Sequence, residues 1–173
     1  NHLSYVDIMA ISYVLPATFL SKAEVRKWPL IGFLTQFAGT LFLRRERKSD
    51  LHALTETFSR VWKEDSMIVM FPEGTSSNGD TVLPFKSSLL KPACDESQPV
   101  TPALVKYECV GGSLKEDVYF WKDMTFAPHL MRLLSVQSVR ATVTFGQPQL
   151  PPHTNRKQLT QSLWQDVQKM HAA

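Results

Sequence analysis

Residues 50–71 constrain the fold most, because they place an amphipathic helix directly before a strand. One helical face carries the recurring apolar residues Leu51, Leu54, Phe58, Val61 and Trp62. This period predicts a helix over residues 50–64 with Ser49 as its N-cap. The apolar run Met67–Phe71 then predicts a buried strand, and the next residues supply a Pro/Gly turn. A helix that leads straight into a buried strand is typical of α/β proteins.

The rest of the chain repeats this alternation of helix and strand. Helices are predicted at residues 7–15, 85–93 and 126–134, and a closing helix through Leu159, Leu163, Val167 and Met170. Strands are predicted at residues 17–21, 40–44, 99–107 and 139–145. We therefore expect an α/β fold, with a mixed, largely parallel sheet flanked by helices on both faces. No linker or repeat divides residues 1–173, so we expect a single domain.

Composition and charge narrow the classes of partner. The chain is 43% hydrophobic and 20% charged, as in an ordinary globular protein. Its longest apolar run, residues 8–20, contains Pro16 and is shorter than the ~20 residues that span a bilayer. Residues 22–48 hold seven basic and two acidic residues, a net charge of +5, so the remainder of this +3 chain carries −2. This local field suits a phosphate-bearing substrate, a CoA or acyl-carrier-protein donor, or anionic lipid headgroups.

Other function classes lack their expected patterns. The basic residues have no interleaved stacking aromatics, which disfavours nucleic acid. The two cysteines, Cys94 and Cys109, form neither a metal-binding spacing nor a disulfide framework. They favour a reducing, cytoplasmic compartment.

His2 and Asp7 are the first candidates for chemistry. A histidine can take a proton from a hydroxyl near neutral pH. If Asp7 lies about one turn along a following helix, its carboxylate can reach the distal imidazole nitrogen, fix the tautomer and stabilise the imidazolium. The chain has no G-x-S-x-G turn, so this pair would act on a substrate hydroxyl rather than on an enzyme serine.

Four sequence blocks resemble those of the PlsC-type glycerolipid acyltransferases, the 1-acylglycerol-3-phosphate acyltransferase family. His2 to Asp7 is similar to the HxxxxD motif, and Phe71 to Thr75 is the FPEGT block unaltered. Residues 39–45 resemble the glycerophosphate-binding block, and residues 100–103 resemble the final Val-x-Pro block. The match covers residues 1–107 and departs from the family at Ser76, where many members carry arginine.

The resemblance implies a function and a set of site residues. The expected reaction moves a fatty acyl group from acyl-CoA or acyl-carrier protein to lysophosphatidate, giving phosphatidate, with no cofactor and no metal. His2 and Asp7 would be catalytic, whereas the substrate would be held by Arg45, Glu73, Gly74, Thr75 and Lys22. The resemblance also implies a protein on the cytoplasmic face of a membrane, with an anchoring part that precedes residue 1.

Individual roles follow from side-chain chemistry. The planar fork of Arg45 can hold two phosphate oxygens, and Lys22 can add a point charge. Glu73 can accept a hydrogen bond from the glycerol hydroxyl or hold Arg45 in place. Backbone N–H groups of Gly74 and Thr75 are candidates to bind phosphate or the thioester oxyanion.

The acyl chain requires an apolar groove, and several alternatives stay open. Candidate groove residues are Val14, Phe19, Trp28, Ile31, Phe33, Leu34 and Phe37. The same chemistry on another acceptor, such as lyso-ornithine lipid, is one alternative, because a fold does not fix a substrate. A non-catalytic lipid-binding module is another. A metal-dependent hydrolase would need a third ligand beside His2 and Asp7, and the sequence offers none at a recognisable spacing.

Overall fold

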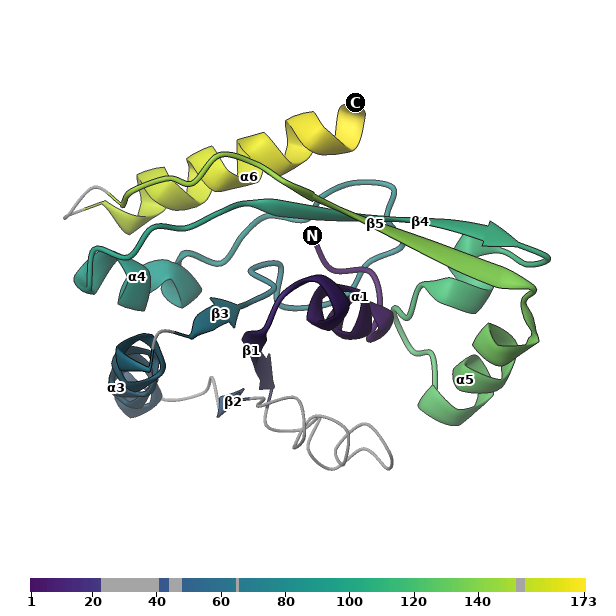
Figure 1. The fold of residues 1–173 in the computed structure, drawn as a ribbon, viewed down its shortest axis with the longest axis horizontal. Coiled ribbons are helices and arrows are strands. Elements are labelled where there is room, and N and C mark those ends of the chain that lie inside the picture. The colour runs from purple at the N-terminus through teal and green to yellow at the C-terminus, as the bar shows by residue number, and fades with distance from the viewer. Residues whose placement is uncertain (23–40, 44–47, 65, 152–154) are drawn as a thin grey trace.

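The computed structural model describes residues 1–22, 41–43, 48–64, 66–151 and 155–173 (Figure 1). Three parallel strands form one sheet in the order β2-β1-β3. Their bounds are Ala17–Lys22 for β1, Leu41–Leu43 for β2 and Met67–Val69 for β3. All three strands match predicted ones, within one or two residues at each end. The third is not fully buried, since Met67 is 47% exposed.

A second sheet is an antiparallel pair of long strands, β4 (Ala103–Val110) and β5 (Ser138–Phe145). Its register runs from Ala103 opposite Phe145 to Val110 opposite Ser138. The mixed α/β class is therefore confirmed, but among the described residues the strands form two sheets instead of one. The predicted start of β4 at residue 99 was wrong by four residues. Pro102 lacks the N–H that a continuous ladder needs, so Val100 makes only an isolated bridge to Gln149.

Five helices accompany the strands in the described residues. They are α1 (Val6–Val14), α3 (Lys48–Lys63), α4 (Lys91–Asp95), α5 (Phe126–Ser135) and α6 (Arg156–Ala172). The predicted helices near residues 7–15, 50–64 and 126–134 and at the C-terminal end are confirmed. The N-cap assignment of Ser49 was wrong, because α3 already begins at Lys48. The predicted helix 85–93 is a 3₁₀ turn, η2 (Ser87–Leu90), followed by α4, whose second residue is Pro92.

Helices cover both faces of the β4–β5 pair (Figure 1). On one face Val167 of α6 packs against Leu104 of β4. Leu159 and Leu163 of the same helix pack against Leu90 and Cys94, in η2 and α4. The first turn of α6 is capped by the Asn155 side chain, which accepts the N–H of Gln158 at 3.1 Å. On the other face α1 shares a core with β1 and β4, formed by Leu3, Ile11, Phe19, Val105, Tyr107 and Val118.

Residues 111–137 connect β4 to β5. They contain a π-helical turn, η3 (Leu114–Val118), and α5. Tyr5, just before α1, donates its O–H to His129 Nδ1 of α5 at 3.0 Å, and the opposite ring nitrogen lies 3.0 Å from the Tyr119 carbonyl. Because that carbonyl can only accept, the Nε2 of His129 carries the proton. This network ties α5 to the segment that holds His2.

Candidate active site

The imidazole of His2 and the carboxylate of Asp7 are in direct contact. Nδ1 of His2 lies 2.7 Å from Oδ2 of Asp7, and the Asp7 side chain is fully buried. Because a carboxylate accepts, Nδ1–H donates, which leaves Nε2 as the nitrogen able to take a proton. The His2 side chain is 21% exposed, so this nitrogen is within reach of a substrate. The contact predicted from the five-residue spacing is thus present.

Asp7 accepts four hydrogen bonds from the described residues. Besides His2, its Oδ2 accepts the backbone N–H of Leu3 at 2.7 Å and of Ser4 at 3.2 Å. Its Oδ1 accepts the phenolic O–H of Tyr107, from β4, at 2.7 Å. These donors compensate the loss of water around a buried carboxylate. Burial and the nearby Asp7 raise the pKa of Tyr107, so its phenol remains a donor.

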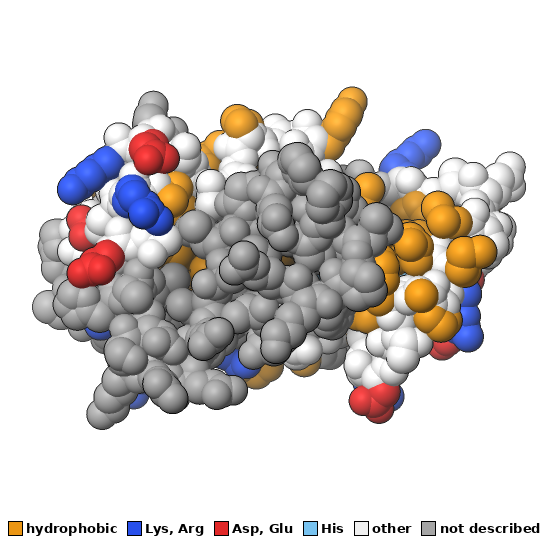
Figure 2. Space-filling view, turned by 90° about the horizontal axis from the view of Figure 1, so that it is seen from below, with side chains coloured by type: hydrophobic (Ala, Val, Ile, Leu, Met, Phe, Trp, Pro, Cys, Tyr) orange, Lys and Arg blue, Asp and Glu red, His pale blue; other side chains and the backbone are white. Residues whose placement is uncertain are grey.

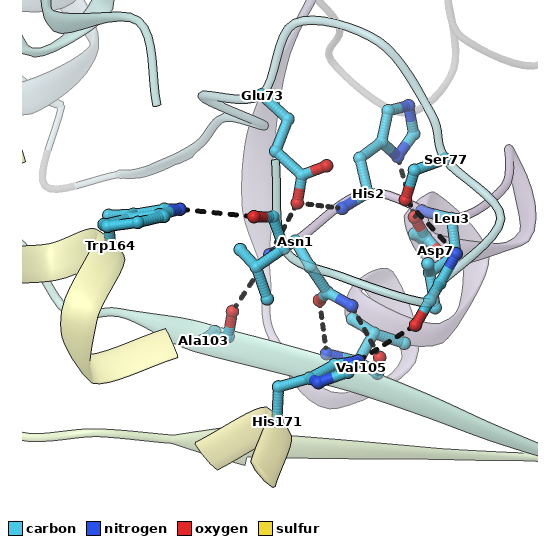
Figure 3. A network of polar contacts seen from close by, with 12 residues as sticks. Asn1, His2, Leu3, Asp7, Glu73, Ser77, Ala103, Val105, Trp164 and His171 are labelled. Carbon is cyan, nitrogen blue, oxygen red and sulfur yellow. Dashed lines mark hydrogen bonds and ion pairs between the residues drawn. The ribbon is translucent and has the colours of Figure 1, made fainter. Parts of the chain in front are cut away.

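The main chain of His2 is fixed by the loop after β3 (Figure 3). Its N–H donates to Glu73 Oε1 at 3.2 Å, and its carbonyl accepts the N–H of Ser77 at 3.0 Å. The ring of Phe71 stacks on the imidazole, with centroids 4.1 Å apart and planes 19° from parallel. The histidine therefore has a fixed backbone and a fixed ring face.

Glu73 is buried within this loop, only 3% exposed. Burial raises its pKa from 4.5 to about 7, partly offset by the hydrogen bond from the His2 N–H. Oε1 also lies 4.0 Å from the Asn1 nitrogen, whereas Oε2 is buried with no partner among the described groups. Glu73 thus lies against His2 and binds its backbone, a contact that the sequence did not indicate.

The remaining predicted binding residues are only partly located. Gly74 has a φ of 74°, which suits glycine, and its N–H closes the turn onto the Phe71 carbonyl at 3.0 Å. That N–H is bonded within the turn, and the role of Gly74 towards phosphate or an oxyanion stays a prediction. Thr75 is exposed beside it. Lys22 is the last residue of β1, with a side chain outside the described set, and Arg45 lies wholly outside the described residues.

Asn1 is a site residue that sequence reasoning missed. Its side-chain amide donates to the Val105 carbonyl at 2.9 Å and accepts the Val105 N–H at 2.8 Å, so it is clamped to β4 (Figure 3). The residue that precedes His2 is thereby held on the strand. Only the position of Asn1 next to His2 hinted at this role.

An apolar cavity of about 600 Å³ lies behind this constellation. It is bounded by α1, the β3 segment, β4 and α6, and its lining includes Ile11, Val69, Phe71, Ala103, Val105 and Leu163. The predicted groove was wrong for Val14, which is 48% exposed, and for Phe19, which is in the core. The other predicted groove residues, at positions 28–37, lie outside the described residues.

The described residues were also considered as metal ligands and as membrane-spanning helices. No three His, Cys, Asp or Glu side chains within them gather closely enough to bind a metal ion. None of the helices described is both long and apolar enough to span a bilayer.

Comparisons with known proteins agree with the geometry. Residues 1–106 match the family described as Acyltransferase. A lyso-ornithine lipid O-acyltransferase of Pseudomonas aeruginosa is 37% identical over 78% of this chain and 51% of its own length. A 1-acyl-sn-glycerol-3-phosphate acyltransferase of Neisseria meningitidis is 32% identical over 84% of this chain and 56% of its own.

The fold is also that of a solved structure. The crystal structure of the 1-acyl-sn-glycerophosphate acyltransferase PlsC from Thermotoga maritima superposes with a TM-score of 0.65, at 22% identity. The superposition covers 99% of this chain and 63% of that protein. The chain likewise spans 63%, 55% and 51% of the length of three of the curated relatives it matches.

Proposed function

Because this chain belongs to the acyltransferase family, we propose that it carries the catalytic site of an enzyme that moves a fatty acyl group to a lysolipid hydroxyl. The observation that carries the proposal is the 2.7 Å contact between His2 and the buried Asp7. An imidazole oriented by a carboxylate, with its other nitrogen accessible, is a general base for an alcohol. The acyl donor would be acyl-CoA or acyl-carrier protein.

The reaction needs no enzyme nucleophile. Nε2 of His2 takes the proton of the acceptor hydroxyl while its oxygen attacks the thioester carbonyl carbon. Asp7 stabilises the imidazolium that forms. When the tetrahedral intermediate collapses, the carbon–sulfur bond breaks and the imidazolium returns the proton to the departing thiolate. An ester and a free thiol result.

We take lysophosphatidate as the acceptor, with phosphatidate as product. The support is the excess of basic residues at positions 22–48, where Arg45 and Lys22 would bind the phosphate. Glu73 would act on the acceptor through His2, because its Oε1 holds the His2 main-chain N–H. Lyso-ornithine lipid is the second candidate, because several relatives of this chain are named for it. Its headgroup is an amino acid, so it would need no phosphate site.

The apolar cavity would receive the acyl chain. It reaches Asn1 and Phe71, the two residues that flank or stack on His2, so a chain inside it would lie close to the base. Burial of methylene groups there would contribute about 0.8 kcal/mol each.

We further propose that the protein works at a membrane surface, on its cytoplasmic face. Apolar side chains gather on the side of the molecule that carries α5 (Figure 2). There Met131 and Leu134 are 68% and 70% exposed, and on α1 Met9 is 65% exposed. Apolar residues this exposed favour contact with the acyl region of a bilayer.

The test is direct product identification. Full-length protein is incubated with labelled acyl-CoA or acyl-carrier protein and a panel of lysolipids that includes lysophosphatidate and lyso-ornithine lipid. Labelled phosphatidate is expected. Acylation of lyso-ornithine lipid alone would move the assignment to the second acceptor, and no labelled product from any acceptor would refute the function.

A further inference from the structure

We propose that Tyr107 is a positioning residue for acyl transfer, holding the Asp7 carboxylate in the orientation that the His2 imidazole requires. The part of this inference that concerns turnover rests on the proposed function. Tyr107 lies a hundred residues from the HxxxxD motif, in β4, and none of the four sequence blocks includes it.

The first support is that the two Asp7 oxygens accept hydrogen bonds from different donors. Oδ2 receives the imidazole and two backbone N–H groups from the segment before α1, whereas Oδ1 receives only the Tyr107 phenol among the described donors. Asp7 is fully buried, so water cannot replace that phenol. Without it, one carboxylate oxygen would be buried and unpaired, and the carboxylate would rotate or bind a proton to relieve the cost. Either response weakens the contact with Nδ1.

The second support is the rigidity of the strand that carries Tyr107. β4 pairs with β5 at eight consecutive positions from Ala103 to Val110. Two residues before Tyr107, on the same face of the strand, Val105 is clamped to the Asn1 amide by two hydrogen bonds. β4 therefore fixes the motif at two points. It holds the main chain before His2 through Val105 (Figure 3), and it holds the carboxylate that His2 contacts through Tyr107. The five-position spacing of His2 and Asp7 is therefore not all that sets their geometry, because β4 also holds them.

The substitution that tests this is Tyr107→Phe in the full-length protein, because it removes one oxygen and keeps the ring. We expect kcat to fall about ten- to a hundredfold, as for a displaced catalytic group, with KM for both substrates changed by less than about twofold. The matched control is Tyr119→Phe. Tyr119 lies beside Tyr107, with ring centroids 6.2 Å apart, and makes no hydrogen bond to Asp7. It should keep wild-type kcat.

A spectroscopic readout separates this inference from the reaction itself. The Nδ1–H proton of His2, observed by NMR with labelled histidine, reports its hydrogen bond to Asp7. We expect this resonance to move or broaden in Tyr107→Phe but not in Tyr119→Phe. In an Asp7→Asn background Tyr107→Phe should add no further change, because the phenol acts through the carboxylate. If Tyr107→Phe unfolds the protein, 3,5-difluorotyrosine at position 107, a stronger donor of the same shape, should still displace the resonance.

The outcomes are distinguishable. A displaced resonance supports the positioning role even if the wild-type protein acylates no lysolipid. An unmoved resonance together with wild-type kcat in Tyr107→Phe overturns it, and so does an equal displacement in the Tyr119→Phe control.

Discussion

Glu73→Gln should alter how stability depends on pH. The folded-state pKa of Glu73 is about 7, raised from 4.5 by burial, so folding favours its protonated form. Below about pH 4.5 both the folded and the unfolded state carry the proton. Between 4.5 and 7 only the unfolded state releases it, so the free energy of unfolding falls as pH rises. At 1.36 kcal/mol per unit, the loss reaches about 3 kcal/mol and then levels off above pH 7.

The amide that Glu73→Gln introduces cannot ionise, yet its side-chain oxygen can still accept the His2 N–H. The difference in unfolding free energy, variant minus wild type, should therefore grow by about 3 kcal/mol between pH 4.5 and 8. Urea unfolding followed by circular dichroism at intervals of half a pH unit measures it. Glu108→Gln is the control for loss of a carboxylate, because that side chain is 72% exposed. A Glu73→Gln difference that stays constant over this range would refute the reasoning.

Two further predictions concern substrates. Arg45→Ala should raise KM for a phosphorylated acceptor about tenfold or more while leaving KM for the acyl donor nearly unchanged; equal effects on both would contradict a phosphate role. Ala103→Leu should shift the preference towards shorter acyl donors, because Ala103 lines the apolar cavity and a bulkier side chain shortens it. The control is Lys106→Leu, at an exposed side chain of the same strand outside the cavity lining. Rates measured with donors of graded length decide this, and an unchanged profile would place the acyl chain elsewhere.

The contact between His2 and Asp7 was predictable because it is local. Asp7 lies five positions after His2, and a helix that starts at Val6 turns its carboxylate back onto the imidazole. Pro16 could be recognised as the residue that ends this helix, since it lacks an N–H. The turn at Gly74 was likewise evident from its Pro/Gly composition, although the use of its N–H inside that turn was not.

The supporting residues were not predictable because they depend on long-range packing. Nothing local indicates that Tyr107 faces Asp7 or that Asn1 binds Val105, because each contact requires β4 to lie against the start of the chain. The lining of the apolar cavity comes from segments spread between Asn1 and Val167. The arrangement of strands in two sheets is equally a matter of tertiary pairing, because an apolar run does not specify its partner.

The central claim is that the His2 imidazole is the base for acyl transfer. The most direct test is His2→Ala in the full-length protein, with single-turnover acyl transfer and lysolipid binding measured on the same preparation. We predict that transfer falls by about a thousandfold or more while the dissociation constant for the lysolipid changes little. Wild-type transfer in His2→Ala would contradict the account.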